Sequence, residues 1–153
     1  TAIGKNDTQP EKEKTVETKA PEKSVAGKDT LMQYAGRKDQ FNQDIATLAG
    51  DINGYLASHA DFRGTNNYNQ RASSIYQRIS ATRGRLQNEV GVDASLKGQL
   101  FDLLTAEMER VEGLRDGVID SKSGRGYSAG FQRGTAASYR YDSLDATFKQ
   151  SMP

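Results

Sequence analysis

Residues 31–56 read LMQYAGRKDQFNQDIATLAGDINGYL, and residues 68–86 read YNQRASSIYQRISATRGRL. In both segments one set of positions recurs at alternating spacings of three and four, the heptad pattern of helices packed side by side. The first set is Leu31, Tyr34, Lys38, Phe41, Ile45, Leu48, Ile52 and Tyr55, in which Lys38 is the single interruption. The second set is Tyr68, Ala72, Ile75, Ile79, Thr82 and Leu86. The two segments therefore predict two long helices, each with one apolar face.

These two helices can be aligned against each other, because a short connection makes neighbouring helices antiparallel. Across such a pair one residue number rises as the other falls, so facing residues have a nearly constant summed number. When the sum is 123 or 124, an apolar or aromatic side chain of one helix faces one of the other helix in every pair: Ile45 with Ile79, Leu48 with Ile75, Ile52 with Ala72, and Tyr55 with Tyr68. The same register predicts the ion pairs Asp51–Arg71 and Asp44–Arg78, and it leaves Arg37 opposite Arg85 as a like-charged mismatch.

The periodicity continues in the second half of the chain, after a break at Gly91 and with Asp93 as the expected N-cap. A third apolar face contains Leu96, Leu100, Leu104, Met108, Val111, Leu114 and Val118, and a fourth contains Tyr127, Phe131, Ala137, Tyr141, Leu144 and Phe148. We expect an all-α fold, an antiparallel up-down-up-down four-helix bundle with coiled-coil-like hairpins over residues 29–153. Its helices should span about 30–59, 66–90, 94–121 and 127–151.

Glycines four residues apart are a second feature of the sequence, at 50 and 54, at 113 and 117, and at 126, 130 and 134. In membranes this spacing permits close helix contact, but the surroundings here are polar. The heptad phase places Gly50, Gly54 and Gly113 on the outer face. They are either surface positions where no particular side chain is required, or flat strips on which another helix or a flat ligand can lie. A second register, with sums near 244–245, places Leu100 by Leu144, Leu104 by Tyr141, and Gly134 opposite Val111.

Residues 1–28 differ in composition from the rest of the chain, with two prolines, no aromatic residue and alternating Lys and Glu. Such a segment has too little apolar surface to offset the entropy of ordering it, so we predict a disordered linker or tether. Its Lys/Glu/Pro/Thr composition resembles the spacers near the membrane anchor of exported Gram-positive proteins. The alternative is a dispensable terminus.

The residue inventory argues against several chemistries. Without cysteine the chain has no disulfide, thiol catalysis or cysteine-based metal site. His59 is the sole histidine, so we expect no metal, no cofactor and no Glu-x-x-His di-iron centre. Ser58 and Asp61 flank His59, but residues at a helix end supply no pocket or oxyanion hole, and we predict no catalytic residues and no enzyme activity. No apolar run approaches the roughly 18 residues of a transmembrane segment.

Two charged stripes suggest contacts with ions or polymers. Arg71, Arg78 and Arg85 lie seven apart with Arg83 nearby, and a polyanion could contact them, although predicted ion pairs already use two of the three. An acidic ridge on the third helix consists of Glu109, Glu112, Asp116 and Asp120. It offers a surface to a basic partner or calcium, but it lacks the loop of a calcium site. Because residues 29–153 carry equal numbers of basic and acidic side chains, no nucleic acid is expected as a partner.

The best candidates for an exposed partner contact are Tyr76, Arg83, Tyr139 and Arg140, because Tyr and Arg are favoured at interfaces. Together with the tail, the absent Cys and a first residue other than Met, they indicate a non-enzymatic helical binding or spacer module of an exported, surface-tethered bacterial protein. Its partner would be another protein or a cell-envelope component, and its location extracellular or anchored to the cell surface. The alternatives are an intracellular, cytoplasmic helical adaptor completed by homodimerisation, and a polyanion-binding bundle that uses the Arg stripe.

Overall fold

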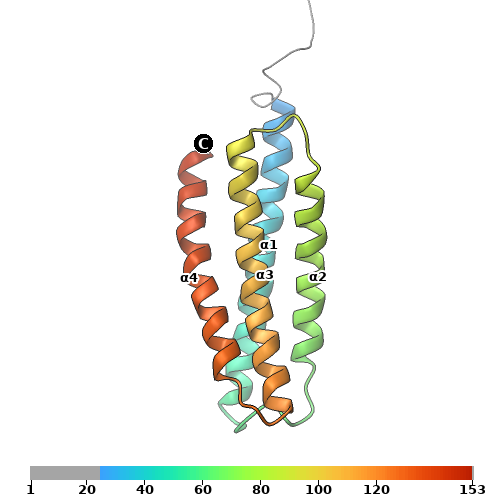
Figure 1. The fold of residues 1–153 in the computed structure, drawn as a ribbon, viewed down its shortest axis with the longest axis vertical. Coiled ribbons are helices and arrows are strands. Elements are labelled where there is room, and N and C mark those ends of the chain that lie inside the picture. Colours follow the sequence, from blue (N-terminus) through green and yellow to red (C-terminus); the bar gives the residue numbers. More distant parts are fainter. Residues whose placement is uncertain (1–24, 153) are drawn as a thin grey trace, which may run out of the picture.

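The protein is described by a computed structural model covering residues 25–152. Four helices run alternately up and down, α1 (Val25–Leu56), α2 (Tyr68–Gln87), α3 (Ala94–Lys122) and α4 (Ser128–Ser151), and the described residues contain no strand (Figure 1). This confirms the predicted all-α antiparallel bundle. The start of α1 and the end of α4 lie at the same end of the bundle, and the α1–α2 and α3–α4 connections lie at the other. Every helix among residues 25–152 is too short or too polar to span a membrane.

The first helix begins earlier than the sequence predicts. Residues 1–24 of the predicted tail lie outside the described residues, but residues 25–28 form the first turn of α1, so this part of the prediction is wrong. Thr30 stands where the first helix was expected to begin, yet its hydroxyl donates to the Ala26 carbonyl at 3.0 Å, the back-bond of a residue inside a helix. Gly27 is buried in this turn. The helix therefore extends into sequence with little apolar character of its own.

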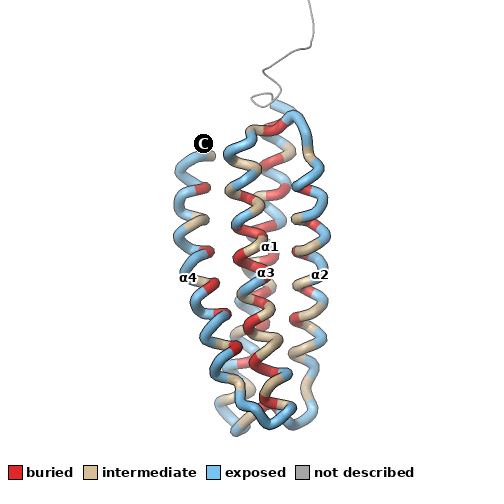
Figure 2. Tube along the Cα trace, viewed as in Figure 1, coloured by how far each residue is buried: buried red, intermediate tan, exposed pale blue. Residues whose placement is uncertain are grey.

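The core lies along the inward face of each helix, as the buried positions in Figure 2 show. Its most enclosed members are the predicted stripe residues, among them Leu31, Ile45, Leu48, Ile79, Leu100, Leu104 and Val111. Burial of such side chains, each worth about 1.5–3 kcal/mol, dominates the stability of the bundle. Asp93 caps α3 as predicted, because its carboxylate accepts from the Leu96 N–H at 3.0 Å.

The α1–α2 hairpin has the predicted register. Arg71 contacts Asp51 at 2.8 Å and Arg78 contacts Asp44 at 3.4 Å, and the rings of Tyr55 and Tyr68 lie 5.5 Å apart in an edge-to-face arrangement. The predicted like-charged mismatch between Arg37 and Arg85 is relieved because each of these side chains contacts another residue. The Arg37 guanidinium lies 5.7 Å from the centre of the Tyr34 ring, and Arg85 donates to the Thr82 hydroxyl at 3.1 Å.

One core residue comes from a segment predicted only as a turn. Phe62, in the α1–α2 connection, has no solvent-exposed surface, and its N–H donates to the Ser121 hydroxyl at 2.9 Å. Its ring packs among the rings of Tyr55, Tyr68 and Phe131, with centroid distances of 5.5–6.2 Å. This aromatic cluster closes the end of the bundle opposite the termini.

Helices α3 and α4 meet through their glycines, which corrects the predicted outer position of Gly113. An added Cβ at Gly113 would lie 2.5 Å from the Gly134 nitrogen and 2.6 Å from the Gly130 oxygen, and one at Gly130 would lie 2.4 Å from the Gly117 nitrogen. The glycine pairs 113/134 and 117/130 both sum to 247, so the predicted register is wrong by about two residues. Gly134 lies in this close backbone contact rather than opposite Val111. Gly50 and Gly54 face open space and lie outside, as predicted.

Candidate functional site

Of the four predicted contact residues, two are engaged within the bundle. Tyr76 is half-buried against the core, and the Arg115 guanidinium lies 5.2 Å from the centre of its ring. Arg83 lies 4.9 Å from the centre of the Phe101 ring and donates to the Thr105 hydroxyl at 2.9 Å. These contacts hold α2 against α3, so both residues have a structural task.

The other two contact residues lie on the outside of α4. Tyr139 is 72% exposed, whereas the other six tyrosines are buried or half-buried. Its neighbour Arg140 is half exposed and forms an ion pair with Glu109 of α3. The structure therefore brings together Tyr139 and Arg140 on one helix, but it does not bring them together with Tyr76 and Arg83 as one surface.

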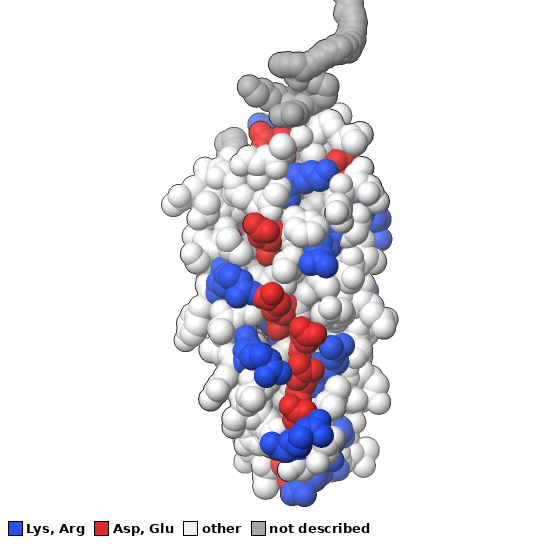
Figure 3. All heavy atoms as spheres, in the orientation of Figure 1, with Lys and Arg blue, Asp and Glu red and all other residues white. Residues whose placement is uncertain are grey.

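The carboxylates of the acidic ridge on α3 are paired with arginines of α3, of α4 and of the connection between them. Figure 3 shows a column of acidic side chains flanked on both sides by Lys and Arg. Asp116 contacts Arg133 at 3.0 Å, Asp120 contacts Arg125 at 2.7 Å, and Glu112 contacts Arg115 at 3.5 Å. Within residues 25–152 no three His, Asp or Glu side chains gather as metal ligands would. Such partly exposed pairs each add at most about 1 kcal/mol, and they leave the ridge almost neutral.

The residues around His59 do not form a catalytic arrangement. Its ring stacks on Tyr55 with centroids 3.9 Å apart, and Nδ1 lies 3.1 Å from the Ser58 hydroxyl. Asp61 turns to Arg63 instead, accepting from its backbone N–H at 2.9 Å and from its Nε at 2.8 Å. The carboxylate that would orient the imidazole is thus bonded elsewhere.

A buried polar cluster lies where α1, α3 and α4 meet. Lys38, the interruption in the apolar stripe, is 1% exposed, and its Nζ contacts Asp145 at 2.6 Å and Asp39 at 2.7 Å. The same ammonium lies 5.7 Å from the centre of the Tyr141 ring. Position 38 is therefore buried, as the heptad pattern predicts, but its side chain is charged and bridges α1 to α4.

Glu107 of α3 lies at the centre of this cluster and is completely buried. Burial raises its pKa from 4.5 to about 9, although the nearby Lys38 and Arg110 charges act in the opposite direction. Tyr141 also has a raised pKa, again mainly because of burial. Neither the Glu107 carboxyl oxygens nor the Tyr141 hydroxyl has a hydrogen bond of normal geometry to the described residues, although the two groups lie close together. At neutral pH the Glu107 carboxyl is consequently protonated.

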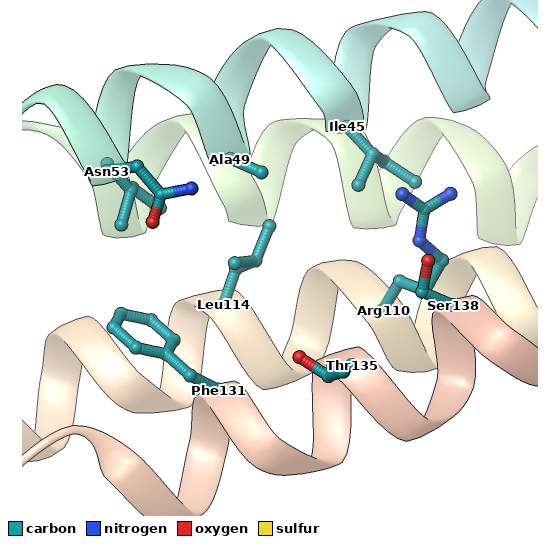
Figure 4. Close-up of a pocket in the computed structure, with 10 residues that line it drawn as sticks. Ile45, Ala49, Asn53, Arg110, Leu114, Phe131, Thr135 and Ser138 are labelled. Carbon is teal, nitrogen blue, oxygen red and sulfur yellow. The ribbon is translucent and has the colours of Figure 1, made fainter.

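Next to this cluster a cleft of about 210 Å³ opens between α1 on one side and α3 and α4 on the other (Figure 4). It exists because α4 packs closely on α3 and makes little contact with α1. Its walls are about equally polar and apolar, with apolar side chains from all three helices, and Arg110 supplies the one charged group. The sequence reasoning did not identify Glu107, Arg110 or the cleft, because their neighbours come from three helices. Lys38 in the heptad stripe was the one signal of a polar core.

Comparison of the chain with protein-family models, with curated proteins and with solved structures gives no match.

Proposed function

We propose that this chain is a non-enzymatic helical binding module of an exported, surface-tethered bacterial protein, and that it contacts its partner through the outer face of α4. The observation that carries the proposal is Tyr139, an aromatic side chain left 72% exposed by a fold that covers every other tyrosine. Single exposed apolar residues are common on protein surfaces, but Tyr139 is followed directly by Arg140. Tyrosine and arginine are the residue types that most often dominate binding energy at interfaces.

The arrangement of the chain ends supports a tethered module. The segment before Val25 joins the bundle at the end where α4 finishes, so the outer face of α4 extends away from that attachment point (Figure 1). The two alternatives have less support. The buried core is formed by residues of all four helices of one chain. Within the Arg stripe, Arg71 and Arg78 pair with carboxylates of α1.

Site-specific photo-crosslinking in cells that make the full-length protein tests the contact surface. A photoreactive phenylalanine analogue at position 139 should give a discrete crosslinked product that Arg140→Ala weakens. The same analogue at Gln77, an exposed position of α2, should give none. The same products from both positions, or none from either, would refute the α4 surface.

The location is tested separately, by adding protease to intact cells. Cleavage of the protein while a cytoplasmic marker stays intact is the expected result. Cleavage only after lysis would refute export and favour the intracellular adaptor, whose dimerisation sedimentation would detect.

A further inference from the structure

The one charged group of the cleft between α1, α3 and α4 is Arg110, and it lies at one end, here called the polar end, while polar and apolar side chains share the rest of the lining. In Figure 4 the Arg110 guanidinium and Ser138 lie at one end, Phe131 and Asn53 lie at the other, and Ala49 and Leu114 face each other between them. Ala49 keeps the cleft open, because a larger side chain at this position would fill it. With a charged group at one end and an aromatic ring at the other, the cleft matches a small ligand that has one polar group and an apolar body.

Arg110 has unused capacity to bind an anion. Its Nη1 donates to the Asn42 side-chain oxygen, and its guanidinium lies 5.6 Å from the centre of the Tyr141 ring. No carboxylate among residues 25–152 lies within ion-pair distance of it, in contrast to the arginines of the outer ridge. A guanidinium carries five N–H donors, so several remain free on the side of the cleft.

The charges around Arg110 do not compensate it at neutral pH. Two other cations, Lys38 and Lys149, already engage the two nearby carboxylates, Asp39 and Asp145. Glu107, one helical turn before Arg110, is protonated because burial raises its pKa to about 9. Within the polar cluster Arg110 is therefore the cation that lacks a counter-charge.

The size and polarity of the cleft limit the ligand. A cavity of about 150 Å³ holds a benzene molecule, so about 210 Å³ accepts one six-membered ring with a small polar group. At the polar end the Ser138 hydroxyl, which makes no hydrogen bond to the described residues, can donate alongside Arg110. One guanidinium and one hydroxyl match a single negative charge and its two oxygens, whereas a phosphate dianion would need further donors.

We propose that this cleft binds a small monocarboxylate whose apolar body is about the size of one benzene ring. The carboxylate would accept hydrogen bonds from Arg110 and Ser138, and the ring would lie between Ala49 and Leu114 with its far edge against Phe131. This proposal is independent of the α4 partner surface, because it uses none of Tyr139, Arg140 or their neighbours on the outer face.

Amide NMR of the complete chain at pH 7 tests it, with phenylacetate as the probe and the neutral phenylacetamide as its isostere. Phenylacetate should shift the resonances of Ala49, Leu114 and Thr135, with a Kd of about 1 mM, as expected for about ten heavy atoms. The amide should bind at least about tenfold more weakly. Equal affinity of the two compounds would show an unselective apolar cleft and overturn the proposal, as would the absence of shifts at 10 mM phenylacetate.

Two pairs of variants locate the binding. Arg110→Met keeps the length of the side chain and should weaken phenylacetate at least about tenfold, whereas Arg115→Met, on the same helix but outside the cleft, should leave its affinity unchanged. Ala49→Leu should fill the cleft and abolish binding, whereas Ala46→Leu, one turn earlier and exposed, should not. The backbone amide NMR spectrum of each variant protein shows whether that variant is folded. Equal effects within either pair would overturn the assignment to this cleft.

Discussion

Replacing Gly113 by alanine should destabilise the bundle, although alanine is the better helix former. The new methyl group would lie 2.5 Å from the Gly134 nitrogen, 2.6 Å from the Gly130 oxygen and 2.7 Å from the Gly134 Cα. All three atoms belong to the backbone of α4, so no side chain can rotate out of the way. Helix α4 must move away from α3, and the packing of both helices is then loosened.

Gly50→Ala is the matched control, because Gly50 lies in the interior of α1 and a Cβ there meets nothing within 4 Å. Each substitution gains about 1 kcal/mol from helix propensity and the restricted unfolded chain. That gain cancels when the two variants are compared, so their difference isolates the cost of overpacking. This cost is about 1–3 kcal/mol in general, and a contact with backbone alone belongs in the upper part of the range, at about 2–3 kcal/mol.

Thermal and urea unfolding followed by circular dichroism measure the difference. For a domain of this size 1 kcal/mol corresponds to about 4 °C, so Gly113→Ala should melt about 8–12 °C below Gly50→Ala and about 4–8 °C below the wild type. Gly50→Ala should melt at or above the wild-type temperature. The heptad phase places both glycines on the outer face and so predicts the same effect for both. Equal stabilisation by the two substitutions would refute the close α3–α4 contact.

Three further predictions concern the core and are measured by urea unfolding. Lys38→Met should cost about 2–3 kcal/mol at pH 7, because it leaves the Asp145 carboxylate with the exposed Lys149 as its one remaining ion-pair partner among the described residues; a loss below 1 kcal/mol would contradict the bridge. The wild type should lose stability between about pH 5 and 9, by up to about 1.4 kcal/mol per pH unit, because folded Glu107, with its pKa near 9, keeps a proton that the unfolded chain releases above its ordinary pKa of 4.5. Glu107→Gln should lack this slope, and identical slopes would contradict the protonated state. Ile45→Ala and Ile75→Ala should each cost about 2–5 kcal/mol, since both side chains are buried; melting like that of the wild type would contradict their place in the core.

The α1–α2 hairpin was predictable because two independent signals agree on its register. The apolar stripes alone permit a shift along the helices, and the complementary charges of Asp44, Asp51, Arg71 and Arg78 select one alignment. The observed ion pairs at 3.4 and 2.8 Å have that alignment. The hydrogen bond of Tyr34 to Glu89 at 2.7 Å continues it, with a summed number of 123.

The α3–α4 pairing was not predictable in the same way, because its closest contacts are made by the backbone atoms of glycines, which have no side chain. A heptad reading counts apolar side chains and gives glycine no weight, so Gly113 and Gly117 were not recognised as the surface on which α4 lies. The spacing of four residues was visible on both helices. Aligning the two glycine series with each other gives the sum of 247 at both contacts.

The glycine contact and the buried charges are two results of the same geometry. Because α3 and α4 approach until their backbones touch, α4 is drawn toward α3 and away from α1. Side chains of ordinary apolar length would leave that space empty, and long polar side chains cross it instead. Lys38 reaches Asp145 of α4 from α1, and Arg110 reaches Asn42 of α1 from α3. The cleft is the part of the α1–α4 space that these side chains do not fill. Lys38 thus bridges α1 to α4 on the side of the bundle where the close α3–α4 contact draws α4 away from α1.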